Sequence, residues 1–203
     1  MEWGINMPSS DFVCGTITVP ERDKVIEPVL RELHDKGIKH IVFMDKEHKG
    51  HKWNITRMMI YLCTHYLDRN AIITMDDIVF KDGWFEKVQE VIDQTDYDVF
   101  TLLTNRPYEP NDVCGLYRAT SNWWMYDHCV VFRRGVLNEC WIGKFMDFCN
   151  RPNLHIKEKN HYDNMISHFL LENGYKCGIV RPNYIKMQNV KSILGHKIVV
   201  KDD

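Results

Sequence analysis

Short apolar runs alternate along the chain with segments in which apolar residues recur at helical spacing. The apolar runs, which are typical of buried strands, are 15–19, 39–44, 71–75, 98–103, 125–132 and 176–180. The segments with helical periodicity are 20–37, 53–67, 83–94, 134–149 and 161–174. This alternation predicts an α/β domain with a central, mostly parallel sheet of about six strands that is flanked by helices.

In the first predicted helix, the apolar residues Val25, Val29, Leu30 and Leu33 are spaced so that they form one face. Gly37 is a plausible end for this helix because glycine adopts the left-handed conformation that often follows a last turn. The pattern therefore predicts a helix that packs on the sheet through these four residues.

Two segments lack a regular pattern. Residues 104–124 are rich in turn formers and aromatic residues, which predicts a long functional loop. Residues 181–203 show little periodicity and are expected to form a C-terminal tail. Because no repeat or linker interrupts the chain, residues 1–203 are expected to form a single domain with its core at about 15–180.

The composition of the chain limits the classes of protein to which it can belong. The chain has 203 residues, of which 44% are hydrophobic and 27% charged, as in ordinary globular domains. Its formal net charge of -2 gives no general reason to bind nucleic acid, and no apolar run is long enough for a membrane span. Seven cysteines at irregular spacing without a CxxC pair indicate reduced, mostly buried thiols and a cytoplasmic protein.

The sequence AIITMDDIVF (71–80) places two adjacent carboxylates, Asp76 and Asp77, directly after a predicted strand. Ligands of open α/β sheets bind beyond the carboxyl ends of strands. Two neighbouring carboxylates repel each other unless a positive partner lies beside them, and Mg²⁺ or Mn²⁺ is such a partner. The alternative is that one aspartate caps a helix near residue 82 while the other is solvated.

Further candidate site residues lie where the first two predicted strands end, at the same edge of the sheet. They are Thr18, Pro20 and Arg22 at the end of the first strand and in the turn that follows it, Asp45 after the second strand, and Lys52, Asn54 and Arg57 in the next loop and helix. Together with the acidic doublet, their order resembles that of the nucleotide-sugar-dependent glycosyltransferases of the GT-A fold. In that family a strand with a T-x-P-x-R-like ending precedes a strand ending in Asp, a helix with Asn and Arg, and a strand ending in a DXD or xDD motif.

The resemblance covers residues 15–180 and implies a single, Rossmann-like GT-A domain. More narrowly, the chain is similar to glycosyltransferase domains of viral proteins that decorate capsid glycans, which would place it in the host cytoplasm. It implies transfer of a hexose or deoxyhexose from a UDP-sugar to a hydroxyl of a glycan or glycoprotein acceptor, with Mn²⁺ or Mg²⁺ as cofactor. The protein would be a monomer or part of a longer multidomain chain, without a membrane span or nucleic-acid partner.

The resemblance also implies roles for the acidic residues. Asp45 would accept the uracil N–H, Asp76 would contact the ribose, the metal or a metal-bound water, and Asp77 would be the principal metal ligand. The sequence departs from a strict DXD motif because Ile78 stands where the third-position aspartate would be. The division of roles between Asp76 and Asp77 therefore stays open.

The remaining candidates for nucleotide and metal binding lie on both sides of the doublet in the sequence. Arg22 and Arg57 would bind the base edge or the diphosphate, with Lys52 and Asn54 near the nucleotide, unless the arginines form surface ion pairs. In the tail, which would close over the nucleotide, His196 would be a further metal ligand and Gly195 would admit the phosphates. The alternative for His196 is a surface position.

Two carboxylates compete for the catalytic role. Asp163 opens a predicted helix where related enzymes place an acidic residue facing the acceptor, although an acid in the first helical turn also favours the helix dipole. Asp127 lies in an otherwise apolar strand and would line the sugar pocket or bond to a neighbour. An inverting or a retaining course stays open. The rival functions are a non-catalytic nucleotide-sugar or carbohydrate-binding module and a sugar nucleotidylyltransferase.

Overall fold

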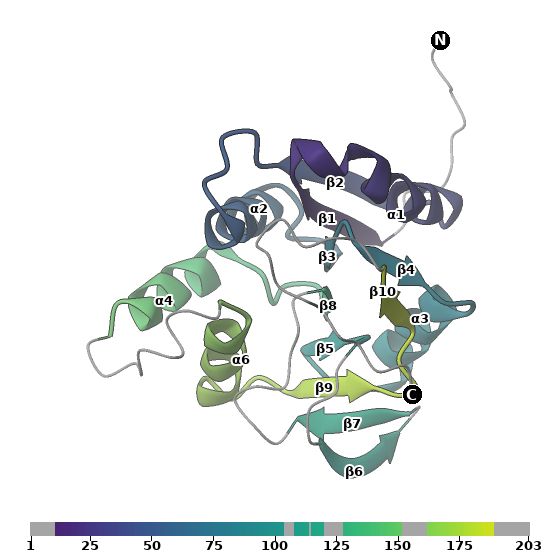
Figure 1. Cartoon of the computed structure of the whole chain (residues 1–203). Coiled ribbons are helices and arrows are strands. Elements are labelled where there is room, and N and C mark those ends of the chain that lie inside the picture. Colours follow the sequence, from purple (N-terminus) through teal and green to yellow (C-terminus); the bar gives the residue numbers. More distant parts are fainter. Residues whose placement is uncertain (1–10, 104–107, 114, 120–127, 152–161, 189–203) are drawn as a thin grey trace.

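The computed structural model describes residues 11–103, 108–113, 115–119, 128–151 and 162–188. Within these residues, one large sheet forms the centre of the molecule and helices cover it (Figure 1). The order of its strands is β2-β1-β3-β8-β5-β9-β7-β6. Their bounds are Phe12–Thr18 (β1), Lys39–Met44 (β2), Asn70–Met75 (β3), Val99–Thr101 (β5), Tyr108–Val113 (β6), Leu116–Ala119 (β7), Cys129–Phe132 (β8) and Cys177–Val180 (β9).

The sheet is mixed but most of its strands share one direction. Strand β1 pairs in parallel with β2 and β3, and β5 pairs in parallel with β9. Strand β8 is antiparallel to β3 and β5, and β7 is antiparallel to β9 and β6. Only β8 and β7 therefore run against the other strands of the described sheet. The carboxyl ends of β1, β2 and β3 meet at one edge.

The predicted α/β class with a single central sheet is confirmed, but the predicted number of strands was too small because the described sheet has eight. The two missed strands, β6 and β7, lie in the segment 104–124, where the sequence predicted a long loop. Their pairing shifts register between Glu109 and Val113, and β7 adds to the edge of β9. This edge pairing is a tertiary contact, so the local pattern of turn formers could not reveal it.

A second, two-stranded sheet was also missed. Strand β4 (Ile78–Phe80) follows the acidic doublet at once and pairs antiparallel with β10 (Ile185–Met187). The prediction that little regular structure follows residue 181 is therefore wrong for 185–187. Both strands are too short to show a periodicity, and they are brought together across about a hundred residues of sequence.

The helices form a layer on each face of the large sheet (Figure 1). Their bounds are Pro20–Arg22 (the 3-10 helix η1), Asp23–Asp35 (α1), His51–His65 (α2), Trp84–Gln94 (α3), Glu139–Cys149 (α4) and Tyr162–Glu172 (α6). Apolar residues of α2, α4 and α6 pack on one face, and those of α1 and α3 on the other. Strand β1 is buried along its whole length because it lies between these two layers.

The buried face of α1 differs from the predicted one. Ile26, Val29 and Leu33 are buried, whereas Val25 and Leu30 are only partly buried. The spacing i, i+3, i+7 of the buried residues matches one helix face, and it is the contact with the sheet that selects this face. The prediction was therefore right for Val29 and Leu33 and missed Ile26.

At Gly15 of β1, the neighbouring helix α2 leaves no room for a side chain. A Cβ atom added to Gly15 would lie 2.5 Å from Sδ of Met58 on α2. This close approach lets α2 lie directly against the strand that carries Thr18 at its end.

The cysteines that the structure describes with their side chains form no disulfide. Cys14, Cys63, Cys129 and Cys177 are buried and Cys149 is partly buried. Burial raises the pKa of the Cys149 thiol to about 11, so this thiol stays protonated at neutral pH. Among the described residues, no helix is long and apolar enough to cross a membrane.

Arg133, directly after β8, joins its own loop to the segment between α3 and β5. Its Nε donates to the carbonyl of Tyr97 at 2.8 Å, and its two terminal nitrogens donate to those of Ile92 at 2.8 Å and Thr95 at 2.7 Å. One planar guanidinium thereby satisfies backbone acceptors at the end of α3 and in the turn before β5.

We expect Arg133→Met to lower the free energy of unfolding by about 2–4 kcal/mol, because charged hydrogen bonds to three carbonyls are lost. Arg134→Met is the matched control: Arg134 is exposed and lies 3.5 Å from Asp11, so its loss should change stability by less than about 0.5 kcal/mol. Urea unfolding measures both. Equal effects of the two variants would contradict the bracing role of Arg133.

Candidate functional site

The carboxyl ends of β1, β2 and β3 are joined through Thr18. Its hydroxyl donates to Oδ2 of Asp76 at 2.6 Å, which links β1 to the doublet after β3. Its carbonyl accepts from the backbone N–H of Asp45 at 2.9 Å, which links β1 to the end of β2. The predicted convergence of these polar residues at one edge of the sheet is therefore found in the structure.

Arg22 supplies the positive charge that the adjacent carboxylates require. One terminal nitrogen, Nη1, donates to Oδ1 of Asp76 at 2.8 Å and to Oδ2 of Asp77 at 2.9 Å. Pro20 begins the turn η1. Within this turn, the backbone N–H of Arg22 donates to the carbonyl of Val19 at 3.0 Å. This turn brings Arg22 back over the strand ends. The helix-cap alternative for the doublet is wrong, because Gly83 is the N-cap of α3.

Both carboxylates are removed from water. Asp76 and Asp77 are each only 2% exposed. Burial raises the pKa of Asp76 above its usual value, the bonds from Thr18 and Arg22 act against this rise, and the charge of Asp77 adds to it. The pKa of Arg22 is also raised: burial works to lower it, but the bond and the charge of Asp76 and the charge of Asp77 prevail. The guanidinium is thus held in its charged form.

One acceptor of the doublet remains open. Oδ1 of Asp77 is buried and has no hydrogen-bond partner among the described residues, and the same is true of Nε of Arg22. A buried carboxylate oxygen without a partner among the described residues is costly, so this oxygen is a position at which a further group can bind. By contrast, both oxygens of Asp76 are already bonded.

These observations test whether the residues fit a divalent cation. Oδ1 of Asp77 is a suitable hard ligand for such an ion. The other three carboxylate oxygens of the doublet already accept hydrogen bonds, two of them from Arg22 and one from Thr18. Within the described ranges, no group of three or more His, Cys, Asp or Glu side chains could hold a metal ion. Among the described residues, Oδ1 of Asp77 is therefore the one oxygen of the doublet that is available to a cation, which would need its other ligands from elsewhere.

Gln188 is a site residue that sequence reasoning missed. Its backbone N–H donates to the carbonyl of Asp77 at 2.6 Å, and its side-chain amide donates to the carbonyls of Ile78 at 3.0 Å and Val25 at 3.2 Å. It therefore fixes the turn of the doublet and brings the chain to Asp77 just before residues 189–203. No sequence signal could have revealed a contact across 110 residues.

Asp45 organises the loop that follows β2. Its Oδ1 accepts from the N–H of Lys49 at 3.0 Å and its Oδ2 from the N–H of Gly50 at 2.7 Å. Burial works to raise the pKa of Asp45, but these amides prevail and lower it below its usual value. Gly50 has a φ of 97°, which suits glycine, and α2 begins at the next residue. Asp45 thus sets the position from which α2 starts.

Asn54 and Arg57 are bonded to the protein itself. The amide nitrogen of Asn54 donates to the carbonyl of Phe43 at 2.7 Å, and its oxygen accepts from Nη2 of Arg57 at 2.8 Å. Nη2 of Arg57 also donates to the carbonyl of Met44 at 3.2 Å, and its guanidinium lies 4.5 Å from the ring centre of Trp53. The predicted contacts of both residues with a nucleotide remain predictions, and Asn54 has a structural task at the strand ends.

Tyr162, the residue before Asp163, joins the start of α6 to α2. The hydroxyl of Tyr162, the first residue of α6, lies 2.7 Å from that of Thr56 on α2. Nζ of Lys52 is 5.8 Å from the ring centre of Tyr162. Asp163 is half-buried and its Oδ1 accepts from the N–H of Asn164 at 2.8 Å, as an acid in a first helical turn does. Its catalytic role remains a prediction.

The other predicted site residues, Asp127, Gly195 and His196, lie outside the described residues. The roles predicted for them therefore remain predictions.

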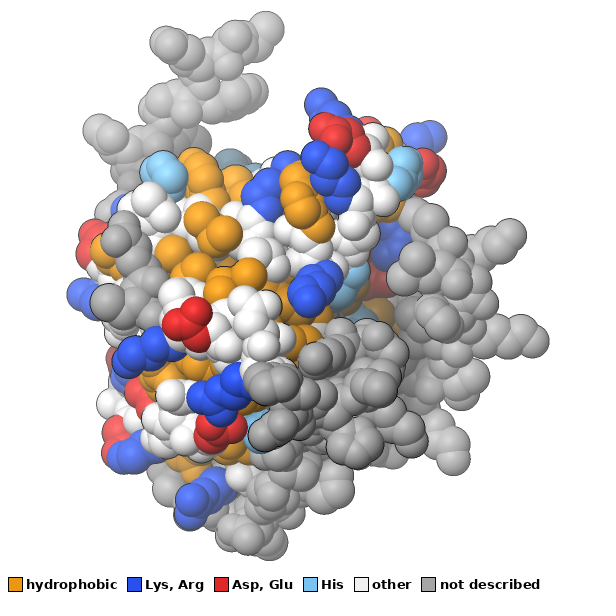
Figure 2. Space-filling model, turned by 90° about the vertical axis from the view of Figure 1, so that its left-hand side faces the viewer, with side chains coloured by type: hydrophobic (Ala, Val, Ile, Leu, Met, Phe, Trp, Pro, Cys, Tyr) orange, Lys and Arg blue, Asp and Glu red, His pale blue; other side chains and the backbone are white. Residues whose placement is uncertain are grey.

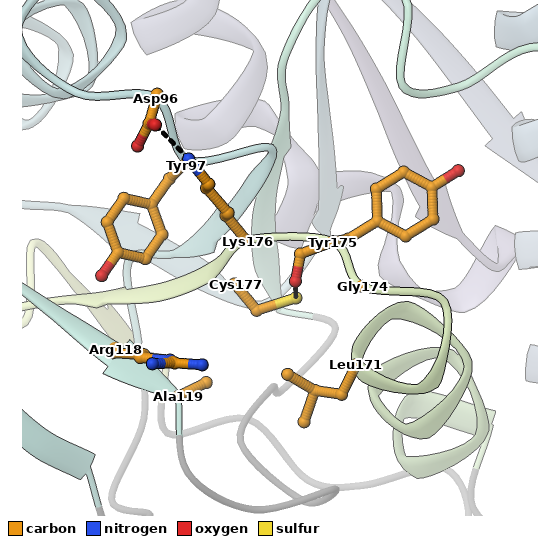
Figure 3. A pocket seen from close by; sticks show the side chains of 9 residues that line it. All are labelled: Asp96, Tyr97, Arg118, Ala119, Leu171, Gly174, Tyr175, Lys176 and Cys177. Carbon is orange, nitrogen blue, oxygen red and sulfur yellow. Dashed lines mark hydrogen bonds and ion pairs between the residues drawn. The ribbon is translucent and has the colours of Figure 1, made fainter.

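Two pockets among the described residues lie away from the doublet. The first, of about 380 Å³, is lined by Tyr97, Arg118, Tyr175 and their neighbours (Figure 3). It lies beside the starts of β5 and β9, which is the opposite edge of the sheet from Asp76. An ion pair between Lys176 and Asp96 borders it. The second, of about 610 Å³, lies between β2 and α2.

Comparison with known proteins gives a distant structural likeness. No family model and no curated protein matches the sequence. Among solved structures, the crystal structure of A197 from STIV aligns over 94% of this chain and 98% of its own, with 11% sequence identity and a TM-score of 0.47. A likeness of this degree assigns neither a family nor a function.

We expect Arg22→Gln to lower the free energy of unfolding by about 3 kcal/mol, because two buried carboxylates lose their cation. Adding Asp77→Asn should restore part of the loss, since only one charge then remains. The control is Lys36→Gln, which breaks an exposed 2.8 Å ion pair with Glu86 and should cost less than about 1 kcal/mol. If Arg22→Gln cost no more than Lys36→Gln in chemical unfolding, Arg22 would not neutralise the doublet.

The pKa shifts of Asp45 and Asp76 predict opposite pH dependences. The pKa of Asp45 is lowered in the folded state, so its carboxylate stabilises the fold above the usual pKa near 3.9, and this contribution disappears as the pH falls through the lower folded value. The pKa of Asp76 is raised, so its contribution is fully present below about 3.9 and decreases as the pH rises through the higher folded value.

The stability advantage of the wild type over Asp45→Asn should therefore shrink below about pH 4, whereas that over Asp76→Asn should grow. Urea unfolding at a series of pH values from about 3 to 7 measures both differences. If the stability advantage of the wild type over the two variants changed in the same direction with pH, the environments assigned to Asp45 and Asp76 would be contradicted.

Proposed function

We propose that the protein is a metal-dependent glycosyltransferase that transfers a hexose or deoxyhexose from a UDP-sugar to a hydroxyl of a glycan acceptor. The observation that carries the proposal is the open, buried oxygen of Asp77 at the meeting point of three parallel strand ends. This edge is where open α/β sheets bind ligands, and the order of its polar residues resembles that of GT-A enzymes.

A divalent cation, when bound, would act as a Lewis acid that neutralises the charge of the departing diphosphate. Asp77 would hold it through Oδ1. Arg22 has further N–H donors, one of them buried without a partner, that suit a phosphate oxygen. Each oxygen of Asp45 already accepts one amide but retains a second lone pair, so it can accept the uracil N–H.

Asp163 would take the proton of the acceptor hydroxyl in an inverting reaction. It lies in the first turn of α6 and is half-buried, so its carboxylate is partly exposed to solvent. Asp127 is the alternative base, and a retaining course would require neither residue in this role.

One observation favours a second candidate, a nucleotide-sugar-binding module that works without a metal. Arg22 already lies between the carboxylates and neutralises them as a cation would. In such a module Arg22 would bind the diphosphate directly and no transfer would occur. The two candidates differ in whether UDP binding depends on a divalent ion.

We expect Mn²⁺ to tighten UDP binding to the wild type by about tenfold or more, which corresponds to about 1.4 kcal/mol. Asp77→Ala should bind UDP equally weakly with and without Mn²⁺, because the open oxygen is lost. Asp93→Ala, at an exposed position on α3, is the matched control and should behave as the wild type. Isothermal titration calorimetry with and without the ion measures these affinities.

Tight, metal-independent binding of UDP to both the wild type and Asp77→Ala would favour the binding module. An absence of UDP binding under all conditions would refute both candidates.

A further inference from the structure

The pocket between β2 and α2 is apolar on a surface that is otherwise polar. Val42 on β2 and Ile60 and Tyr61 on α2 line it, and their side chains are 37%, 45% and 36% exposed. Only two other large hydrophobic residues of the described chain, Leu67 and Met146, are exposed to this degree, and neither lines the pocket. Exposed apolar side chains gathered in one groove indicate a binding surface.

The face of the molecule that carries α2 and α4 is seen in Figure 2. Hydrophobic side chains gather in its upper half, with Lys and Arg side chains beside them. The pocket between β2 and α2 is about 610 Å³ in volume.

One wall of the groove is the edge of the sheet. In the described sheet, β2 is the terminal strand and pairs only with β1. Its other side presents backbone groups that an extended peptide can pair with. A strand added to β2 would set every second side chain over Ile60 and Tyr61 of α2.

The charged residues that line the groove indicate which kind of partner could bind there. Lys46, Arg57 and His65 line it, and none of the lining residues in the described part of the chain is a carboxylate. Arg57 is held in place by its bonds to Asn54 and Met44 and by the ring of Trp53. A cation that is fixed before binding loses little side-chain entropy when an acidic group arrives. The lining therefore complements a partner with acidic side chains.

A second copy of the chain fits less well. Pairing of two β2 strands would bring the sequence KHIVFM (39–44) to the groove, which carries Lys39 and His40 and no acid. Positive groups would then face the fixed Arg57 and Lys46.

We propose that the groove between β2 and α2 is a docking site for an extended segment of a partner protein that carries both apolar and acidic side chains on one face. The segment pairs with β2 as an additional strand, and every second side chain faces α2, where apolar ones contact Ile60 and Tyr61 and acidic ones reach Lys46 and Arg57. The groove does not include the doublet at Asp76, but Arg57, which is also a predicted contact of the nucleotide, lines it.

Selection of a displayed library of random twelve-residue peptides against the full chain tests the proposal. Enriched peptides are expected to carry apolar and acidic residues together at every second position, which is the spacing of one strand face. A synthetic peptide from this set should bind Ile60→Ser and Lys46→Glu at least about tenfold more weakly than the wild type in fluorescence anisotropy. Met146→Ser, which changes an equally exposed apolar residue on α4, should leave binding unchanged.

Two further measurements address strand pairing and charge. N-methylation of alternate backbone nitrogens should abolish binding of the peptide, because it removes the donors that pair with β2. The affinity should also fall as salt is added.

The proposal is overturned if no peptide is enriched, or if enriched peptides bind Ile60→Ser and Met146→Ser equally. It is also overturned if sedimentation shows a dimer that Ile60→Ser dissociates, since the groove would then belong to a second copy.

Discussion

The contact of Arg22 with Asp76 and Asp77 is the interaction on which the candidate site depends. Two carboxylates that are almost completely buried cannot both remain charged without a partner, and the guanidinium provides one within hydrogen-bond distance of each. Because Arg22 follows β1 and the doublet follows β3, the same contact holds two neighbouring strand ends in register. Thr18 extends the connection to Asp45 after β2.

The buried ion cluster also explains why the surrounding backbone is so closely fixed. Asp45 accepts hydrogen bonds from the amides of the loop before α2, and the backbone N–H of Gln188 donates to the carbonyl of Asp77. Each of these bonds satisfies a polar group that the sheet itself leaves unpaired. The result is a rigid edge at which one carboxylate oxygen, that of Asp77, is left for a ligand. A preorganised acceptor of this kind suits a ligand that brings its own positive charge.

Much of this edge could be predicted from the sequence. Apolar runs that end in polar residues locate the strand ends, and parallel strands bring those ends together, so Thr18, Arg22, Asp45 and the doublet were found without coordinates. What the sequence could not predict was that Arg22 itself would stand between the carboxylates. It also gave no sign that Asn54 and Arg57 bond to each other and to the backbone, because such bonds depend on side-chain directions in the folded chain.

The amino-acid sequence by itself determined the α/β class, the three parallel strands and the bounds of most helices, because periodicity and strand length are local properties of the chain. Only the tertiary structure decided that β6 and β7 complete the sheet, that β10 pairs with β4, and that Gln188 lies against Asp77. Each of these features joins segments that are distant in sequence or too short to carry a pattern. Their stability comes from a neighbouring edge or carbonyl that exists only after folding.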